Sequence, residues 1–367
     1  MRYKNLYIAA TSQHVGKTTS TLGLLSAFKL KGIDVGYCKP VGQRHLLYKD
    51  MVVDKDALLF ADILHFDLNP AIHSPVILGK GATTAYLDDP GAFHYEADIL
   101  RAAKTLTDTH EFSIFEGTGH PGVGSVVGLS NADVAHLVNA QVIMVVEGGI
   151  GSTIDMLNMS ISLFRERGVP ILGVIINKTM PEKLEKVKHY VGKSLAAQNL
   201  PLLGVLPYDQ TLAYPLMKSV ADATHGTVTH NSDKLNNKVA DILAGSLMDV
   251  EKLRVNTDLL LVVSTQRLDE AIKKIQAFTK ALNLSTSPLV GIVATGHGTI
   301  SPETENYVAE WEIPLIRTML DTYGSVIKIS RIEVKINSLT PWKVDRAIEL
   351  INQNVDLDFI MTQSREG

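Results

Sequence analysis

Residues 10–19, with the sequence ATSQHVGKTT, lie between a short apolar run and a stretch that favours a helix. They nearly match the phosphate-binding pattern G-x-x-x-x-G-K-[ST], which would end at Gly16-Lys17-Thr18 and place its first glycine at Thr11. In such a loop, backbone N–H groups and the start of the following helix bind phosphate oxygens. Lys17 would add a positive charge beside the outer phosphates, and the Thr18 hydroxyl would bind Mg²⁺. The stretch therefore predicts a nucleotide site; the alternative is an ordinary strand, turn and helix with a solvated lysine.

Short apolar runs alternate with helix-like stretches through the first half of the chain. The runs are continuously apolar, which is typical of parallel strands covered on both faces. The expected strands are Leu6–Ala10, Val35–Lys39, Phe112–Glu116, Val142–Val146, Ile171–Ile176 and Leu202–Leu206. The expected helices are Thr18–Leu30, Lys55–Leu64, Thr153–Arg167 and Pro181–Gln198, with Gly32 and Gly168 at two helix ends. This alternation predicts an α/β fold with a doubly wound parallel sheet.

The second half of the chain changes character. Residues 218–257 include the polar stretch THGTVTHNSDKLNN and are expected to form a linker, with a helix over Lys238–Leu253. A second, smaller α/β domain is expected over residues 258–367, after a first domain over residues 1–217. Its expected strands are Leu259–Val263, Leu289–Ala294, Pro314–Arg317 and Val326–Ile329.

Composition narrows the class of protein. The chain has 35 basic and 39 acidic side chains and a net charge of −4, without a strongly basic segment. A nucleic-acid partner held through phosphates is therefore not expected. The single cysteine, Cys38, allows no internal disulfide, which fits a reducing compartment. The apolar run near the N-terminus is too short for a membrane span or a signal-peptide core. We expect a soluble, cytoplasmic protein that does not bind membranes.

The loop ATSQHVGKTT resembles the G-T-x-x-x-V-G-K-[TS] loop of the dethiobiotin synthetase family and of the related cobyrinic acid amidating synthases. In that family the first glycine lies six positions before the second, at the position of Ala10 here, so the loop is one residue longer than the regular pattern. The resemblance implies a P-loop NTPase domain that binds ATP with Mg²⁺. Its implied ATP-binding loop residues are Gln13, His14, Val15, Gly16, Lys17, Thr18 and Thr19.

Further motifs in the same order are similar to those of this family. CKPVGQ at residues 38–43 matches its K-P-V segment and implies that Lys39 lies near the phosphates or the second substrate, whereas a strand-end lysine facing solvent is the alternative. VDKDALLFADIL places Asp56 where the family has a metal-binding aspartate, although one acid on a helix is commonly only a surface residue. FSIFEGTGHPG resembles V-E-G-A-G-G, and a buried strand would deliver Glu116 to the carboxyl edge of the sheet. The expected catalytic residues are Lys17, Lys39 and Glu116, and the expected Mg²⁺ ligands are Thr18, Asp56 and Glu116.

Two later motifs correspond to the base-binding part of the family's site. GVIINK ends in Asn177-Lys178, and the resemblance implies that the Asn177 amide reads the adenine edge. GVLPYD resembles the final base-contacting loop and implies contacts from Pro207 and Asp209. The glycine turn at residues 148–152 has two interpretations, a second anion-binding turn or a tight connection.

The second half resembles a DRTGG domain over residues 258–352, through LLLVVSTQRLDEAI, LVGIVATGHGTISP, EIPLIRTMLDTYGSVIKI and VDRAIEL. Arg267, Thr295 and Gly296 match that family, whereas Gln266 and His297 stand where its members commonly have Asp and Gly. In long bacterial phosphate acetyltransferases, such a domain sits beside a dethiobiotin-synthetase-like domain and ahead of the acetyltransferase domain. Because the sequence ends at Gly367, we expect no acetyl transfer to phosphate.

Two functions follow from these resemblances. The first is an ATPase or ATP-dependent ligase that acts on a small carboxylate-type metabolite. The second is a non-catalytic, nucleotide-sensing regulatory protein that responds to a small effector. A partitioning-type ATPase is less favoured, because the loop lacks the extra early lysine of that group. The sequence does not fix the oligomeric state; a homodimer is one arrangement that the resemblance implies, because relatives of the first domain often pair across the active site.

Overall fold

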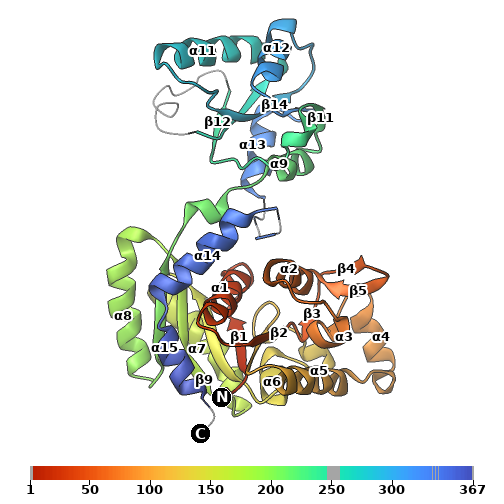
Figure 1. The fold of residues 1–367 in the computed structure, drawn as a ribbon, viewed down its shortest axis with the longest axis vertical. Coiled ribbons are helices and arrows are strands. Elements are labelled where there is room, and N and C mark those ends of the chain that lie inside the picture. Colours follow the sequence, from red (N-terminus) through yellow and green to blue (C-terminus); the bar gives the residue numbers. More distant parts are fainter. Residues whose placement is uncertain (1–2, 246–256, 333, 335, 338, 366–367) are drawn as a thin grey trace. The chain divides into compact units, whose positions relative to one another are not determined.

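A computed structural model describes residues 3–245, 257–332, 334, 336–337 and 339–365. The chain divides into two compact units, Met1–Asp209 with Ile336–Gly367 and Gln210–Lys335. Because the ribbon of Figure 1 is coloured by residue number, the first unit contains both its red N-terminal part and the blue helices α14 (Pro341–Asn354) and α15 (Leu357–Ser364). Within the described part of the chain, no helix is both long and apolar enough to cross a lipid bilayer.

A six-stranded parallel sheet forms the centre of the first unit. Its strand order is β10-β9-β8-β1-β7-β2. The strands are β1 (Leu6–Ala10), β2 (Val35–Cys38), β7 (Phe112–Glu116), β8 (Gln141–Glu147), β9 (Ile171–Thr179) and β10 (Leu202–Pro207). They confirm all six expected strands and the doubly wound parallel fold. Since β2 and β7 lie on one side of β1 and β8 on the other, the chain changes direction at β1, where such sheets bind ligands.

Helices cover both faces of this sheet (Figure 1). Alternate residues of β1 serve opposite faces: Tyr7 and Ala9 belong to the core shared with α5, α6, α7 and α8. The other face carries α1, with α14 and α15 beside β10. The helices of this unit are α1 (Lys17–Leu30), α2 (Lys55–Leu64), α3 (Pro70–His73), α4 (Ala82–Asp88), α5 (Tyr95–Thr109), α6 (Asn131–Leu137), α7 (Gly151–Glu166), α8 (Leu184–Ala196), α14 (Pro341–Asn354) and α15 (Leu357–Ser364). Gly32 and Gly168 have positive φ just after α1 and α7, as expected for residues that end helices.

The segment between β2 and α5 contains short strands that the sequence did not indicate. Parallel β3 and β6 pair with each other, and antiparallel β4 and β5 form a hairpin. The strands are β3 (Val41–Gly42), β4 (His45–Tyr48), β5 (Met51–Asp54) and β6 (Val76–Ile77). The hairpin leads directly into α2, so it determines where that helix begins.

The second unit contains a five-stranded sheet with the order β11-β15-β14-β13-β12, in which β11 is antiparallel to β15 and the other pairs are parallel. Helices α11 and α12 share a core with one face, and α9 and α13 share a core with the other. The elements are α9 (Met217–Thr224), β11 (Thr227–His230), β12 (Asp241–Ala244), β13 (Leu259–Ser264), α11 (Leu268–Ala281), β14 (Leu289–Thr295), α12 (Pro302–Glu310), β15 (Leu315–Thr318) and α13 (Thr322–Ser330).

Three expectations for the second half were wrong. The strand expected at Val326–Ile329 is part of helix α13, because Asp321 caps that helix by accepting a hydrogen bond from the N–H of Gly324 at 2.5 Å. The polar stretch expected as a linker contributes β11 to the sheet, and β12 lies within the expected helix over Lys238–Leu253. Residues 246–253 of that expected helix lie outside the described residues.

The boundaries of the units also differ from the domains expected from the sequence. Residues 336–365 return to the first unit, whereas the expected second domain extended over residues 258–367. The reason is the apolar face of α14, where Ala347, Leu350 and Ile351 are buried at helical spacing. This helix packs against α1. Farther on, Val355 bridges Gly204 of β10 in antiparallel fashion.

Candidate functional site

The loop between β1 and α1 has the backbone of a phosphate-binding turn. His14 and Gly16 have positive φ angles of 62° and 94°, and α1 begins directly afterwards at Lys17. Ala10 is the last residue of β1 and is extended, so the alanine fits where the resembling family has glycine. Among the loop residues expected to bind the nucleotide, Gln13 and His14 are exposed and Val15 is buried, whereas Thr18 and Thr19 lie in the first turn of α1.

Asn177 holds this loop from the end of β9. Its amide nitrogen donates a hydrogen bond to the Val15 carbonyl at 2.8 Å, and its side-chain oxygen accepts one from the N–H of Lys178 at 2.8 Å. A Cβ atom on Gly16 would lie 2.0 Å from the same amide nitrogen, so a glycine is required there. Asn177 therefore supports the loop, and reading of an adenine edge by this residue stays a prediction.

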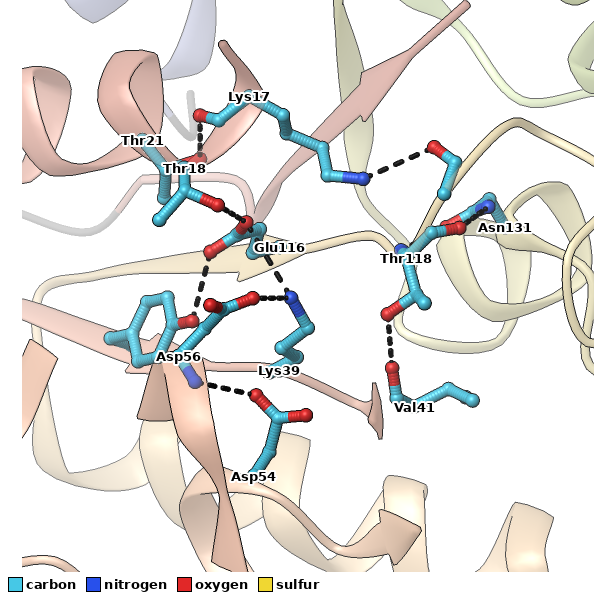
Figure 2. A network of polar contacts seen from close by, with 12 residues as sticks. Lys17, Thr18, Thr21, Lys39, Val41, Asp54, Asp56, Glu116, Thr118 and Asn131 are labelled. Carbon is cyan, nitrogen blue, oxygen red and sulfur yellow. Dashed lines mark hydrogen bonds and ion pairs between the residues drawn. The ribbon is translucent and has the colours of Figure 1, made fainter. Parts of the chain in front are cut away.

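Glu116 and Thr18 meet at the carboxyl edge of the sheet, as Figure 2 shows. Glu116 is the last residue of β7 and is fully buried. The Thr18 hydroxyl donates a hydrogen bond to Oε1 of Glu116 at 2.8 Å. Nearby, the Lys17 ammonium donates to the carbonyl oxygen of Gly119 at 3.2 Å. The structure thus brings together three of the residues that the motifs indicated.

Lys39 is a buried cation between two carboxylates. Lys39 directly follows β2, and the residue is only 5% exposed, so the alternative of a solvated lysine does not apply. The ammonium forms an ion pair with Asp56 and lies 3.6 Å from Oε1 of Glu116. Burial alone would lower the pKa of Lys39, but the carboxylates of Glu116, Asp56 and Asp54 outweigh it and raise the pKa above its ordinary value. Lys39 is therefore positively charged at neutral pH.

Asp54 helps to position Asp56 at the start of α2. It caps α2, and its carboxylate accepts a hydrogen bond from the N–H of Asp56 at 2.8 Å. Burial raises the pKa of Asp54 to about 6, against the attraction of Lys39. Sequence reasoning did not single out Asp54, although an aspartate just before a helix is a common capping signal.

The glycine-rich loop after Glu116 is held by Asn131. Its amide nitrogen donates to the carbonyl oxygens of Thr118 and His120 at 2.9 and 2.7 Å. Its side-chain oxygen accepts from the Thr118 N–H at 2.9 Å and from the Tyr7 hydroxyl at 2.8 Å. Because this loop includes the carbonyl of Gly119 that receives Lys17, Asn131 helps to position that lysine. Asn131 follows β7 by 15 positions in sequence, and no local pattern indicates its role.

The two remaining predicted residues lie at the far end of the sheet. Pro207 ends β10, and Asp209 lies just beyond it. The carboxylate of Asp209 accepts a hydrogen bond from Nε of Arg346, on α14, at 2.5 Å. Asp209 thus ties α14 to this loop, and its expected contact with a nucleotide base stays a prediction.

The donor set fits a hard divalent cation. Mg²⁺ prefers oxygen ligands and is usually bound by one or two carboxylates together with waters and substrate phosphates. Thr18, Asp56 and Glu116 offer a hydroxyl and two carboxylates at one edge of the sheet. Lys39 lies between the two carboxylates, and the Thr18 hydroxyl bonds to Glu116. Within the described ranges no cluster of three or more His, Cys, Asp or Glu side chains could hold a metal by itself. A cation here would therefore need phosphate oxygens or water to complete its shell.

Comparisons with known proteins agree with the resemblance. The sequence pattern of a family described as an AAA domain matches residues 4–215. A phosphate acetyltransferase of Nitratidesulfovibrio vulgaris is 22% identical over 362 residues, covering 96% of this chain and 50% of that protein. An ATP-dependent dethiobiotin synthetase of Anaeromyxobacter dehalogenans is 23% identical over 210 residues, covering 57% of this chain and 92% of that protein. A probable cobyric acid synthase of Methanosphaera stadtmanae is 26% identical over 247 residues, covering 60% of this chain and 48% of that protein.

The extents of these matches differ between the two halves of the chain. The synthetase match covers little more than half of the chain, whereas the acetyltransferase match covers nearly all of it. The chain spans about half the length of the curated phosphate acetyltransferases it matches. The family match ends at residue 215, so the resemblance of residues 258–352 to a DRTGG domain stays a prediction.

Proposed function

The chain belongs to the AAA domain family through residues 4–215, and from this premise we propose that it binds ATP with Mg²⁺ and transfers the terminal phosphoryl group to a small carboxylate-type metabolite. The first unit is a P-loop domain of the group that includes dethiobiotin and cobyric acid synthases. The observation that carries the proposal is the joint position of Thr18, Glu116, Lys39 and Asp56 at one edge of the sheet.

Phosphoryl transfer depends mainly on positioning and on neutralising charge. Lys17 and the amides of the loop would hold the phosphates of ATP. Mg²⁺, held by Thr18, Asp56 and Glu116, would neutralise charge on the β- and γ-phosphates. Lys39 would then be available to draw the substrate carboxylate toward the γ-phosphate.

The proposed reaction transfers the γ-phosphoryl group of ATP to the carboxylate of the metabolite. A carboxylate oxygen of the metabolite forms a bond to the γ-phosphorus, and the bond from that phosphorus to the bridging oxygen of ADP breaks. The products are an acyl phosphate and ADP, and an amine attacking the acyl carbon would release phosphate. Lys39 neutralises the incoming carboxylate, which would otherwise be repelled by the phosphates.

The proposal is tested by combining a binding and a turnover measurement. Calorimetric titration with a non-hydrolysable ATP analogue and Mg²⁺ should show binding, and ADP release from ATP should rise with one member of a panel of small mono- and dicarboxylates. Lys17→Ala should remove both, whereas Lys104→Ala, on the exposed surface of α5, should change neither. An absence of nucleotide binding by the unaltered chain would refute the proposal.

A second function is favoured by the extent of the similarity. The match to phosphate acetyltransferase continues through the second unit, whereas the match to dethiobiotin synthetase does not. A nucleotide-sensing regulatory protein would bind ATP without turning it over. Tight binding of the nucleotide with no ADP release for any carboxylate in the panel would therefore favour sensing over catalysis.

A further inference from the structure

Both carboxylate oxygens of Glu116 accept hydrogen bonds. One donor is Thr18, and the other is Tyr37, a residue to which none of the sequence motifs assigned a role. Oε1 accepts from the Thr18 hydroxyl at 2.8 Å and lies 3.6 Å from the Lys39 ammonium. Oε2 accepts from the hydroxyl of Tyr37 at 2.9 Å. Tyr37 is 2% exposed and Glu116 is 0% exposed, so water does not compete for this hydrogen bond. The carboxylate therefore has one orientation that satisfies all of its partners.

The ring of Tyr37 is fixed by its neighbours. Tyr37 lies on β2, in register with Ile114 of β7, the strand that ends at Glu116. Its ring stacks on Phe60 of α2, with centroids 4.1 Å apart and planes inclined by 4°. Helix α2 also carries Asp56 in its first turn. Tyr37 thus contacts two of the elements that carry expected metal ligands: β7, which ends at Glu116, and α2, which begins with Asp56 in its first turn.

The direction of the hydrogen bond follows from the chemistry of the two groups. An ionised carboxylate has no proton to give and can only accept, so the Tyr37 hydroxyl is the donor across the 2.9 Å contact. Glu116 is the acceptor, and its carboxylate is held by a neutral donor rather than by a second cation.

We propose that Tyr37 is a positioning residue for the metal site, which turns the Glu116 carboxylate so that Oε1 faces Thr18 and the bound cation. This inference rests on the proposed function, because it concerns the Mg²⁺ that accompanies ATP. Partners that orient a metal ligand without touching the metal typically contribute 10–100-fold in metal affinity. Tyr37 is placed as such a partner: its ring is held by stacking on Phe60, and its hydroxyl bonds to Oε2 of Glu116.

Tyr37→Phe tests the proposal, because it removes the hydroxyl and keeps the stacking ring. We would measure Mn²⁺ binding by electron paramagnetic resonance in the presence of a saturating non-hydrolysable ATP analogue. The expected result is a rise of about 10-fold or more in the Kd for Mn²⁺. Affinity for the analogue without metal should stay unchanged. Tyr95→Phe, on α5 with its ring stacked on Tyr86, is the matched control and should bind Mn²⁺ like the unaltered chain.

A double-variant cycle separates positioning from a general structural effect. In a Glu116→Gln background, Tyr37→Phe should weaken Mn²⁺ binding little further, since its partner has already lost the carboxylate. An equal loss in both backgrounds, or unchanged Mn²⁺ affinity in Tyr37→Phe, would overturn the proposal. If Tyr37→Phe does not fold, Phe60→Leu carries the test, because it releases the ring and should also weaken Mn²⁺ binding. Failure of the unaltered chain to bind Mn²⁺ with the analogue would instead refute the proposed function.

Discussion

The ammonium nitrogen of Lys39 lies 3.6 Å from Oε1 of Glu116, and both side chains are buried. The same ammonium is paired with Asp56, so it offsets part of the negative charge of the two carboxylates expected to bind the metal. Lys39 and a divalent cation would thus satisfy the same negative charge. Binding of Mg²⁺ would relieve Lys39 of part of that role and leave it free to contact a phosphate or a substrate carboxylate.

Lys39→Met should destabilise the protein in the absence of metal. Removing one partner from a buried ionic group leaves uncompensated charge, which typically costs about 3–5 kcal/mol. Thermal unfolding in EDTA should show the loss. Millimolar Mg²⁺ should raise the Tm of the variant more than that of the unaltered chain, because the cation replaces the missing charge. Lys104→Met, at an exposed lysine, is the control. Equal responses to Mg²⁺ in the variant and the unaltered chain would contradict the shared role.

Gly16→Ala should disturb the nucleotide loop through a single methyl group. The added Cβ would lie 2.0 Å from the amide nitrogen of Asn177 and would break its hydrogen bond to Val15. We expect a loss of stability larger than the roughly 1–2 kcal/mol that a positive φ alone costs, together with weaker nucleotide binding. Gly32→Ala supplies the comparison, since Gly32 also has positive φ but its Cβ would meet nothing within 4 Å. Denaturant unfolding and nucleotide titration of both variants check the difference, and equal effects would count against a role of the contact.

The nucleotide loop and the large sheet were predictable because their signals are local. The runs at Leu6–Ala10 and Phe112–Glu116 are continuously apolar, and both are strands buried along their whole length. A buried strand followed by a glycine-containing turn and a helix leaves few other arrangements. The positions of Lys17, Thr18 and Glu116 follow from that topology, because parallel strands end at one edge of the sheet.

The supporting residues could not be found in the same way, because their partners are distant in sequence. Tyr7 and Asn131 meet across 124 positions, and Asp209 and Arg346 across 137. Neither pair leaves a periodic pattern in the chain. The segment at Val326–Ile329 was misinterpreted for a related reason: a short apolar run fits a strand or a buried helix, and only the cap at Asp321 distinguishes them.

Stability should fall with acid through His73, which packs against the ring of Phe66 and accepts a hydrogen bond at Nδ1 from the N–H of Asn69 at 2.9 Å. Burial lowers the pKa of His73 to about 4. The unfolded chain, with an ordinary pKa near ~6.5, takes up a proton first. Stability is therefore complete above about pH 6.5 and is lost progressively toward pH 4, by up to about 3 kcal/mol.

His73→Asn checks this assignment, because its side-chain oxygen can accept the same hydrogen bond without titrating. Denaturant unfolding between pH 4 and pH 7 should show a shallower loss of stability for the variant than for the unaltered chain. Because the carbonyl of His73 accepts the N–H of Lys39 at 2.9 Å, nucleotide binding in the same variant reports whether α3 supports the site. If the free energy of unfolding depends on pH in the same way in the variant and the unaltered chain, His73 does not cause the loss of stability in acid.

Gly23→Ala should show whether the C-terminal segment packs on the first unit, as in the structure, or belongs to the second domain, as the sequence predicts. Gly23 lies in α1, where an added Cβ would meet Cγ1 of Ile351 at 2.4 Å and the carbonyl oxygen of Ala347 at 2.9 Å, both on α14. Overpacking of this kind typically costs about 1–3 kcal/mol, which outweighs the gain of about 0.5–1 kcal/mol from replacing a helical glycine. Gly192→Ala, in α8, meets only Cδ2 of Leu202 at 3.5 Å and should be neutral or stabilising. Equal free energies of unfolding for the two variants would mean that α14 does not pack on α1, and residues 336–365 would then belong with the second unit, as the sequence predicts.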